Sequence, residues 1–385
     1  GAPTSLKNTV IGLKKEGFDN LKILCAFPDM KYFFEKEAGV VVGDIYSPHL
    51  LAGRVFVGLA SFFYLRTFVI FWVEILKMPW TIYRQVQTFK TENVDIIHLN
   101  SSILFIVAIS AKILKIKLVW HIREVIIGGR WSLKKRFAGW YIRTLADQVI
   151  CISEVEAKSL GNDTKKNVHI VYNFIDFSNF VCNKTDMQEE KLRYGVNSEK
   201  VFISLGGVSF RKGTVEIIQT AKILPESLFF IAGSYPVNHD YTRYKKILLR
   251  FIHSLEDILM KNNIKQIYSW YYTQRVEMLY FGLKLPNLKF VGQLNSVNSF
   301  LAISHALIFS GCTPHFPRPV YESWAMKKPV VVFDIDGVRG NIDSGVDGVV
   351  CKSNDASGLA EALLLVHSGM GESGYKKAVV KFDMV

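Results

Sequence analysis

Cysteine is scarce in this chain: five residues among 385, with no C-x-x-C pair and no regular spacing. A disulfide framework or a cysteine-based zinc site would need paired, closely spaced cysteines, so the sequence argues against both. We expect ordinary buried thiols and a reducing compartment. The cysteines are Cys25, Cys151, Cys182, Cys312 and Cys351.

Long uncharged hydrophobic runs are also absent. The most apolar stretch, within 54–88, contains Arg66 midway and Glu74 near its end, whereas a membrane-spanning helix needs roughly 20 apolar residues with few or no charges. A buried core helix, a helix that dips into a membrane surface and a true span all remain open for this stretch. The first residues do not show the charged segment followed by an apolar segment that marks a signal peptide.

Acidic residues are outnumbered by basic ones, 34 to 47, which gives a formal net charge of +13. This balance fits three kinds of partner: nucleic acid, an anionic membrane surface, or a polyanionic small molecule such as a nucleotide sugar. No recognised nucleic-acid-binding motif accompanies the charge, so the first kind is disfavoured. The hydrophobic content of 49% is that of a folded globular protein.

Short apolar runs alternate with longer segments of helical spacing along the whole chain. Unbroken apolar strands between helices indicate parallel sheets covered on both faces, and 385 residues exceed one ordinary core. We therefore predict an α/β protein with two Rossmann-like, doubly wound domains, residues 1–180 and 195–385, joined through the polar stretch 176–200. The expected strands are 21–27, 96–100, 117–121, 148–152 and 168–172 in the first half, and 201–205, 228–233, 288–291, 306–310, 329–333 and 348–351 in the second.

Polar clusters follow four of these strands. Ligands of doubly wound sheets bind at the carboxyl ends of the strands, so these clusters form the candidate site. His121 ends the strand 117–121 and is followed by Arg123 and Glu124. The other three clusters are "LGGVSFRKG" (205–213), "HFPRPVYE" (315–322) and "DIDGVRGNIDSG" (334–345).

The loop "LGGVSFRKG" opens onto a helix that we expect near Gly213. Gly206 and Gly207 permit close backbone approach, and a helix start favours an anion. Arg211 and Lys212 add positive charge for a phosphate. The loop matches neither G-x-G-x-x-G nor a P-loop, so a plain turn is the alternative.

The turn "HFPRP" leads into a short helix predicted over 321–327. Pro317 and Pro319 remove backbone donors near the helix start, and we place Pro319 at the first helical position. The positive charge of Arg318 can attract a phosphate in place of the missing backbone donors. Glu322, expected in the first helical turn, can accept two hydrogen bonds from hydroxyl groups.

Asp334 and Asp336 invite a divalent-metal interpretation, because two aspartates follow a strand. Basic residues adjoin every phosphate-like cluster and can provide the same electrostatic stabilisation, so we predict no metal and no cofactor. His121 and His315 are not predicted to be zinc ligands, since no third ligand has suitable spacing.

Taken in order, these segments resemble the large retaining glycosyltransferase family 4 (glycosyl transferases group 1), of the bacterial polysaccharide type and with the GT-B fold. The resemblance covers nearly the whole chain, and the ordered set of motifs is more specific than any single one. It rests on "GAPTSL", "DIIHLNSS", "LVWHIRE", "ADQVICISE", "VYNFID", "LGGVSFRKG", "PRPVYESWAMKKPVV" and "GVRGNIDSGVDG".

The resemblance implies that a nucleotide-diphosphate sugar binds in a cleft between two domains. Its sugar would pass, with retained configuration, to a lipid-linked or polysaccharide acceptor, without metal and with basic side chains stabilising the leaving diphosphate. Glu322 would bind the ribose, and His121 would contact the donor sugar or β-phosphate. The implied catalytic residues are His121, Arg211, Lys212 and Glu322, and the implied donor-binding residues are Gly1, Ala2, Gly206, Gly207, His315, Phe316, Arg318, Pro319, Val320 and Glu322.

Two positions depart from the family pattern. Gly207 stands where an arginine often follows the first glycine, and Arg211 can substitute. Pro314 stands eight residues before Glu322, where the family has a first glutamate that contacts the donor sugar, and His315 can partly replace it. Two alternatives therefore stay open: a non-catalytic protein that binds nucleotide sugar or glycan, and a GT-B nucleotide-sugar epimerase.

The resemblance further suggests that a first strand is absent before Gly1 and that a last crossover helix is absent after "GYKKAVVKFDMV". A basic amphipathic helix expected over 129–146 suits an anionic lipid surface, and an outer helix whose aromatics face the sheet is the alternative. We expect a cytoplasmic protein at the inner face of a membrane. Its expected partners are a nucleotide sugar, a glycan or lipid-linked acceptor and an anionic membrane surface, with no nucleic acid.

Overall fold

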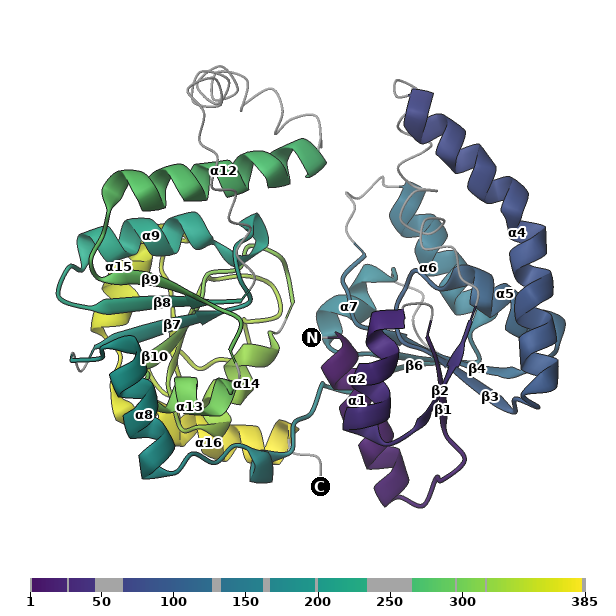
Figure 1. Ribbon diagram of the computed structural model, residues 1–385, viewed down its shortest axis with the longest axis horizontal. Coiled ribbons are helices and arrows are strands. Elements are labelled where there is room, and N and C mark those ends of the chain that lie inside the picture. Colours follow the sequence, from purple (N-terminus) through teal and green to yellow (C-terminus); the bar gives the residue numbers. More distant parts are fainter. Residues whose placement is uncertain are drawn as a thin grey trace. The chain divides into compact units, whose positions relative to one another are not determined.

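The chain folds into two units, each built on parallel strands covered by helices (Figure 1). The computed structural model describes residues 2–25, 28–45, 65–126, 133–161, 167–197, 200–233, 265–294, 296–315 and 317–382. The first unit extends to Ile175 and the second begins at Asp176.

The first unit contains a two-stranded and a four-stranded sheet. β1 (Lys22–Cys25) pairs in parallel with β2 (Val41–Asp44), and the larger sheet has the order β3-β4-β5-β6. Helices connect the strands, as parallel pairing requires. The remaining strands are β3 (Ile96–Leu99), β4 (Lys117–Ile122), β5 (Gln148–Cys151) and β6 (Val168–Ile170), and the helices are α1 (Ala2–Lys15), α2 (Pro28–Ala38), α4 (Leu65–Thr91), α5 (Phe105–Ile113), α6 (Leu133–Leu145) and α7 (Glu154–Ser159).

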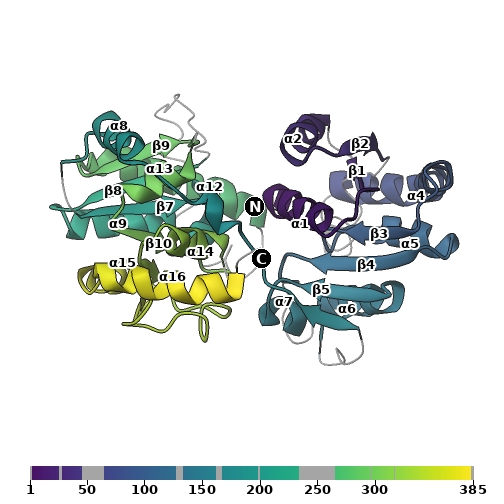
Figure 2. The same cartoon turned by 90° about the horizontal axis from the view of Figure 1, so that it is seen from below.

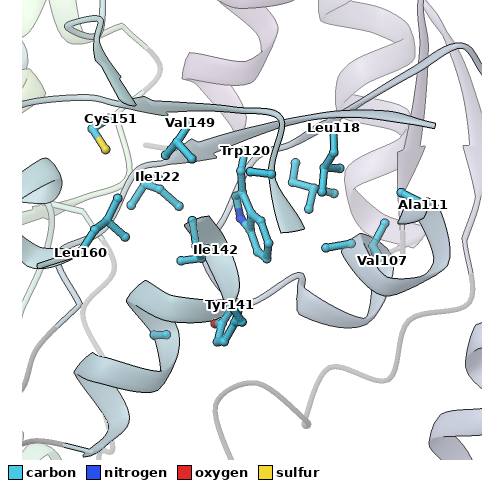
Figure 3. Close-up of a cluster of buried hydrophobic side chains, with 14 of the residues drawn as sticks. Val107, Ala111, Leu118, Trp120, Ile122, Tyr141, Ile142, Val149, Cys151 and Leu160 are labelled. Atoms are coloured by element: carbon cyan, nitrogen blue, oxygen red, sulfur yellow. The ribbon is translucent and has the colours of Figure 1, made fainter. Parts of the chain in front are cut away.

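Strand β4 forms the centre of the core under the four-stranded sheet (Figure 3). Leu118 and Trp120 are fully buried on one face, two residues apart as strand geometry requires, and Tyr141 of α6 lies 5.7 Å from the Trp120 ring, centroid to centroid. The Trp120 indole N–H donates to the Ser101 carbonyl oxygen (2.8 Å), and the Tyr141 hydroxyl donates to the Ser102 carbonyl oxygen (2.9 Å). The apolar core thereby holds the loop that follows β3.

The second unit contains one six-stranded parallel sheet in the order β12-β11-β10-β7-β8-β9. The chain builds outward from β7 to β9 and then returns to place β10 on the other side of β7, so the strand order reverses between β7 and β10. The carboxyl ends of strands at such a reversal are where open α/β sheets bind ligands. The strands are β7 (Val201–Leu205), β8 (Leu228–Ala232), β9 (Leu288–Gly292), β10 (Ala306–Phe309), β11 (Val330–Val332) and β12 (Val349–Val350).

Helices and short 3-10 turns surround this sheet on both faces (Figures 1 and 2). Helices α9 and α12 pack against each other, and so do α13 and α8. The elements are η1 (Phe177–Asn179), α8 (Lys184–Tyr194), η2 (Phe210–Lys212), α9 (Thr214–Ile223), α12 (Lys265–Leu283), α13 (Val297–Ala302), α14 (Arg318–Ala325), α15 (Ala356–Leu364) and α16 (Ser368–Phe382).

Two glycines let α16 approach α14 closely. A Cβ on Gly374 would lie 2.2 Å from Cδ1 of Trp324, and one on Gly371 would lie 2.1 Å from the Lys327 carbonyl oxygen. Trp324 is fully buried, and its indole N–H donates to the Asp347 carbonyl oxygen (2.8 Å). Because the ring is buried and its N–H is hydrogen-bonded, the contact leaves no room for a side chain at position 374.

The predicted fold class is confirmed, and each of the expected strands overlaps a strand of the structure. Strand β2 was not predicted, because "VVGD" is short, contains Gly43 and is only partly buried. The stretch expected to be a linker is largely folded into the second unit: Asn183 caps α8, and Tyr194 packs on the Phe300 ring with centroids 5.2 Å apart. The few apolar residues in this polar stretch suffice to dock the helix.

Within the described part of the chain, no helix has both the length and the hydropathy that crossing a membrane requires. Of the stretch 54–88, residues 54–64 lie outside the described residues. The remainder belongs to α4, which buries Gln85 and Phe89 toward α5 and leaves its other face exposed. Of the aromatics of α6, Tyr141 is buried in the core, whereas Phe137 and Trp140 are exposed.

Candidate functional site

The loop after β7 begins with two glycines whose amides are already used. The N–H groups of Gly206 and Gly207 both donate to the Ala232 carbonyl oxygen at the end of β8 (3.0 and 2.8 Å). Both glycines have positive φ (118° and 72°), and a Cβ on Gly233 would lie 2.3 Å from the Gly207 nitrogen. The glycines therefore join the loops after β7 and β8, and these two amides are not free to bind phosphate.

Lys212 lies in the loop at the carboxyl end of β7, next to the carboxyl end of β10. A Cβ on Gly206 would lie 2.9 Å from its Cε, so the lysine stem crosses that glycine, and its ammonium lies 5.3 Å from the centroid of the Phe309 ring. Burial lowers the pKa of Lys212. Among the described residues, no acceptor forms a hydrogen bond or an ion pair with its Nζ. The lysine is thus a half-buried cation without an anion from the described residues.

The end of β10 fixes the backbone that carries Lys212. Gly213 adopts the left-handed conformation (φ 61°) before α9, and a Cβ there would lie 2.1 Å from the Ser310 carbonyl oxygen. The Ser310 hydroxyl donates to the Lys212 carbonyl oxygen (2.9 Å). Only glycine has the conformational freedom and the space for this approach. Arg211, the preceding cation, is exposed.

His315 lies on the same phenylalanine ring as Lys212. Its ring meets Phe309 edge-on, with centroids 5.4 Å apart, and its Nδ1 lies 2.7 Å from the Thr313 carbonyl oxygen. A carbonyl can only accept, so Nδ1 carries the proton and Nε2 is an acceptor. Burial, followed by the charges of Lys212 and Arg211, lowers the pKa of His315, while the bond to Thr313 partly opposes this. The imidazole is therefore neutral beside the cation.

Helix α14 begins earlier than expected, and this changes the position of Glu322. The predicted start at 321 is wrong: Pro317 is the N-cap, in an extended conformation (φ −79°, ψ 132°), and Arg318 is the first helical residue. Pro319 is therefore second, and Glu322 lies beyond the first turn. The Val320 N–H donates to the Pro317 carbonyl oxygen (3.0 Å), so neither Pro319 nor Val320 offers a free amide.

Arg318 and Glu322 form an ion pair on the surface of α14. The Arg318 Nε lies 2.6 Å from Glu322 Oε1, and the two side chains are 17% and 14% exposed. The angle at Nε is not that of a hydrogen bond, so the contact is mainly electrostatic. Arg318 thus shares its charge with Glu322, and its role toward a phosphate stays a prediction. The second carboxylate oxygen of Glu322 is still able to accept a hydroxyl.

The aspartates of "DIDG" interact with an arginine of their own loop. Arg339 donates to both carboxylate oxygens of Asp334 (2.6 and 2.9 Å), and its Nη1 lies 3.8 Å from Asp336. The pKa of Asp334 is lowered by this hydrogen-bonded arginine. Within the residues that the structure describes, no group of three or more His, Cys, Asp or Glu side chains is arranged to hold a metal ion.

In the first unit, His121 lies at the end of β4 beside His98 of β3. The imidazole rings are stacked 5.4 Å apart, centroid to centroid, and His121 Nδ1 lies 3.3 Å from His98 Nε2 and 3.4 Å from Nη2 of Arg123. An arginine can only donate, so His121 Nδ1 must accept and its proton belongs on Nε2. That Nε2 is buried and has no hydrogen-bond partner in the described structure.

Arg123 connects this histidine pair to three other segments. Its guanidinium donates to the side-chain oxygens of Asn100 after β3 and Asn173 after β6 (2.5 Å each), and more weakly to Thr9 of α1 (3.4 Å). Burial, together with Arg123, lowers the pKa of His98 to about 4, and burial, Arg123 and His98 lower that of His121 to about 2. Both imidazoles are therefore neutral at physiological pH.

Two family models match the chain. Glycosyltransferase Family 4 matches residues 1–179, and Glycosyl transferases group 1 matches residues 186–370. Together they span nearly the whole chain and both units. The chain belongs to the GT-B glycosyltransferases of group 1.

Proteins of known sequence or structure agree with this assignment. The uncharacterized glycosyltransferase MJ1178 of Methanocaldococcus jannaschii is 22% identical over 233 residues, 60% of this chain and about half (53%) of that relative. The crystal structure of Anabaena Alr3699/HepE in complex with UDP-glucose has a TM-score of 0.73 at 18% identity, over 100% of this chain and 92% of that chain. A glycosyltransferase from Rickettsia africae ESF-5 has a TM-score of 0.69 at 16% identity, with coverage of 100% and 92%. These solved structures share the GT-B fold with this group 1 glycosyltransferase.

The structure brings part of the predicted site of this glycosyltransferase together. In the second unit, Lys212 and His315 share the Phe309 ring, and Gly206 lies under the lysine. Ala2 is the first residue of α1 in the other unit, and Gly1 and Phe316 lie outside the described residues.

Sequence reasoning missed two residues that support the site. Phe309 was considered only as a strand residue, although it contacts both Lys212 and His315. His98 lies in the quoted segment "DIIHLNSS", but its spacing gives no sign that it meets His121. The only available signal was that each histidine lies near the carboxyl end of a predicted strand.

We expect the histidine pair to make the free energy of unfolding of this glycosyltransferase depend on pH. Both folded-state pKa values lie below the ordinary 6.5, so the unfolded chain binds protons first as pH falls below about 6.5. The stabilisation that depends on neutral His98 should therefore be complete above about pH 6.5. As the pH falls from there to about 4, the free energy of unfolding should decrease by up to about 1.4 kcal/mol per pH unit. Urea unfolding from pH 7 to 4.5 should show a shallower loss in His98→Gln and His121→Gln than in wild type.

The control is His169→Gln, which replaces an exposed histidine and should leave the pH profile parallel to wild type. If the His98 and His121 variants also follow a parallel profile, the pair is not held neutral by its surroundings.

Proposed function

We propose that this glycosyltransferase moves a sugar from a nucleotide-diphosphate sugar to a lipid-linked or polysaccharide acceptor, with retained configuration and without a divalent metal. The observation that carries the proposal is the half-buried Lys212 ammonium, which lies at the reversal of strand order without an anion from the described residues. A diphosphate is the chemical group that would neutralise it. Group 1 membership supports transfer from a nucleotide sugar, and the UDP-glucose in the Anabaena structure makes UDP the first nucleotide to test.

In the proposed reaction, the bond between the anomeric carbon and the diphosphate oxygen breaks as negative charge grows on the leaving group. Lys212 and the exposed Arg211 would stabilise that charge, which is the electrostatic work a metal would otherwise do. The acceptor hydroxyl oxygen forms the new bond on the same face of the sugar, and its proton passes to the departing phosphate oxygen. Retention follows because the bond forms on the face from which the leaving group departs.

The remaining donor contacts are assigned by chemistry. Neutral His315 offers an acceptor at Nε2 beside Lys212, which suits a sugar hydroxyl. Glu322 keeps one carboxylate oxygen outside its ion pair with Arg318, which suits a ribose hydroxyl. The role of His121 toward the donor sugar, implied by the family, stays a prediction.

A second candidate is a non-catalytic protein that binds a nucleotide sugar. It is favoured by Pro314 at the position of the family's first glutamate and by the loss of free amides in the first turn of α14. Both features weaken sugar and phosphate recognition without removing the cation.

We expect Lys212→Met to weaken UDP binding about ten- to a hundredfold, because a charge-assisted contact to the diphosphate is lost while the stem is kept. Uridine, which has no phosphate, should bind both proteins alike. Isothermal titration measures both ligands. Lys222→Met, an exposed lysine on α9, is the control and should bind UDP as wild type does. Equal UDP affinity of Lys212→Met and Lys222→Met would place the diphosphate elsewhere.

Glu322→Gln should weaken UDP and uridine to the same degree, about ten- to a hundredfold, because the lost charged acceptor would serve the ribose that both ligands carry. Glu361→Gln on α15 replaces an exposed glutamate and should change neither affinity. Since Arg318 loses its partner in Glu322→Gln, the melting temperature is recorded as well. A variant that is folded and binds uridine like wild type would show that Glu322 pairs with Arg318 and does not bind the ribose.

The product distinguishes the candidate functions. With a radiolabelled UDP-sugar and membrane-extracted lipid acceptors, we expect label in the lipid fraction, and we expect it to persist in EDTA. Label that stays in intact donor would favour the non-catalytic binder, and conversion to a free epimer would favour an epimerase. Activity that EDTA abolishes and magnesium or manganese restores would refute metal independence.

A further inference from the structure

Helix α4 of the first unit presents an apolar face to solvent. Four large residues recur along it at intervals of four, four and three, which places them on one face of a helix. The opposite face carries the buried Gln85 and packs on α5. The exposed residues are Trp72 (48% exposed), Leu76 (76%), Trp80 (56%) and Tyr83 (53%).

This apolar face is additional to the buried side of α4, which already places Phe89 in the core. Surface helices turn their apolar side to the core and their polar side to water, and contiguous exposed apolar patches mark sites of interaction. Here the Trp80 and Tyr83 rings even stack on each other outside the core, 5.6 Å apart at 28°. In Figures 1 and 2, α4 runs along the outer side of its unit.

The charges on this face indicate what would cover it. Residues 72–91 contain a single acidic residue, Glu74, and residues 75–91 contain none, and the exposed Lys77 and Arg84 form no ion pair with the described residues. Each follows an apolar residue directly, Leu76 and Tyr83, so it lies about 100° around the helix from the apolar face. The result is a row of aromatic and aliphatic side chains beside a row of cations.

We infer that this α4 face, formed by Trp72, Leu76, Lys77, Trp80, Tyr83 and Arg84, binds an anionic lipid bilayer with the helix lying in the plane of the surface. Tryptophan and tyrosine are the side chains preferred at the level of the lipid headgroups, and an apolar face flanked by lysine and arginine is typical of interfacial helices. A purely apolar protein partner would leave the cations unmatched, whereas an anionic bilayer matches both rows. The inference does not depend on the proposed transfer reaction.

The test is flotation of the purified full chain with vesicles of phosphatidylcholine alone or mixed with phosphatidylglycerol. We expect the anionic vesicles to bind more protein, and salt to reduce that binding. Leu76→Gln and Trp80→Gln should each lower the partition coefficient roughly tenfold or more. Lys77→Gln and Arg84→Gln should each lower it about fivefold on anionic vesicles only.

Two exposed aromatics elsewhere in the same unit provide matched controls. Phe18 is 59% exposed and Tyr32 is 70% exposed, and Phe18→Gln and Tyr32→Gln should bind vesicles as wild type does. If the four α4 variants bind like these controls, the inference is wrong. It is also wrong if Trp80→Gln changes the sedimentation coefficient without lipid, since the face would then join two copies of the chain. UDP titration of Trp80→Gln separates this inference from the proposed function, because the nucleotide affinity should not change.

Discussion

The close approach of Gly213 to Ser310 is the contact on which the candidate donor site depends. A side chain at 213 would collide with the carbonyl at the end of β10, and the Ser310 hydroxyl ties down the carbonyl of Lys212. Together they hold the lysine ammonium over Phe309, which also supports His315. Strands β7 and β10 are neighbours because the strand order reverses between them. As a result, the loops that follow these two strands, about a hundred residues apart in the sequence, both contact Lys212.

Each unit contains a partly buried cation, and the two cations have opposite surroundings. In the first, the charge of Arg123 is spread over the neutral oxygens of Asn100 and Asn173 and kept beside two neutral imidazoles. In the second, Lys212 lies against an aromatic face and lacks an anion among the described residues. A cation that is hydrogen-bonded within the protein stabilises the local structure, whereas a cation without such partners favours binding of an external anion.

The strands of both units could be predicted because parallel strands buried on both faces are continuous apolar runs, a pattern that needs no knowledge of neighbours. The polar clusters at their carboxyl ends follow from the same pattern. The start of α14 could not be placed, because Pro317 and Pro319 both suit a helix start and only the extended conformation of Pro317 decides between them. The ion pair of Arg318 with Glu322 depends on this helix start, because side chains four residues apart are neighbours only when both residues belong to one helix.

Contacts between strands are the part that the sequence leaves open. His98 meets His121 because β3 and β4 pair with Leu99 opposite Trp120, and a different register would move the two rings apart. Phe309 is indistinguishable from other strand residues until the loops above it are in place. Both supporting residues therefore required the three-dimensional structure.

The glycine contacts between α14 and α16 make those helices behave as one body. Gly371 and Gly374 let the backbone of α16 rest directly on Lys327 and Trp324, and sliding by one turn would bring bulkier residues against both. Any movement that shifts Glu322 relative to β10 must therefore carry the whole of α16 with it. The residue nearest the expected ribose is thus mechanically linked to a helix that takes no part in the chemistry.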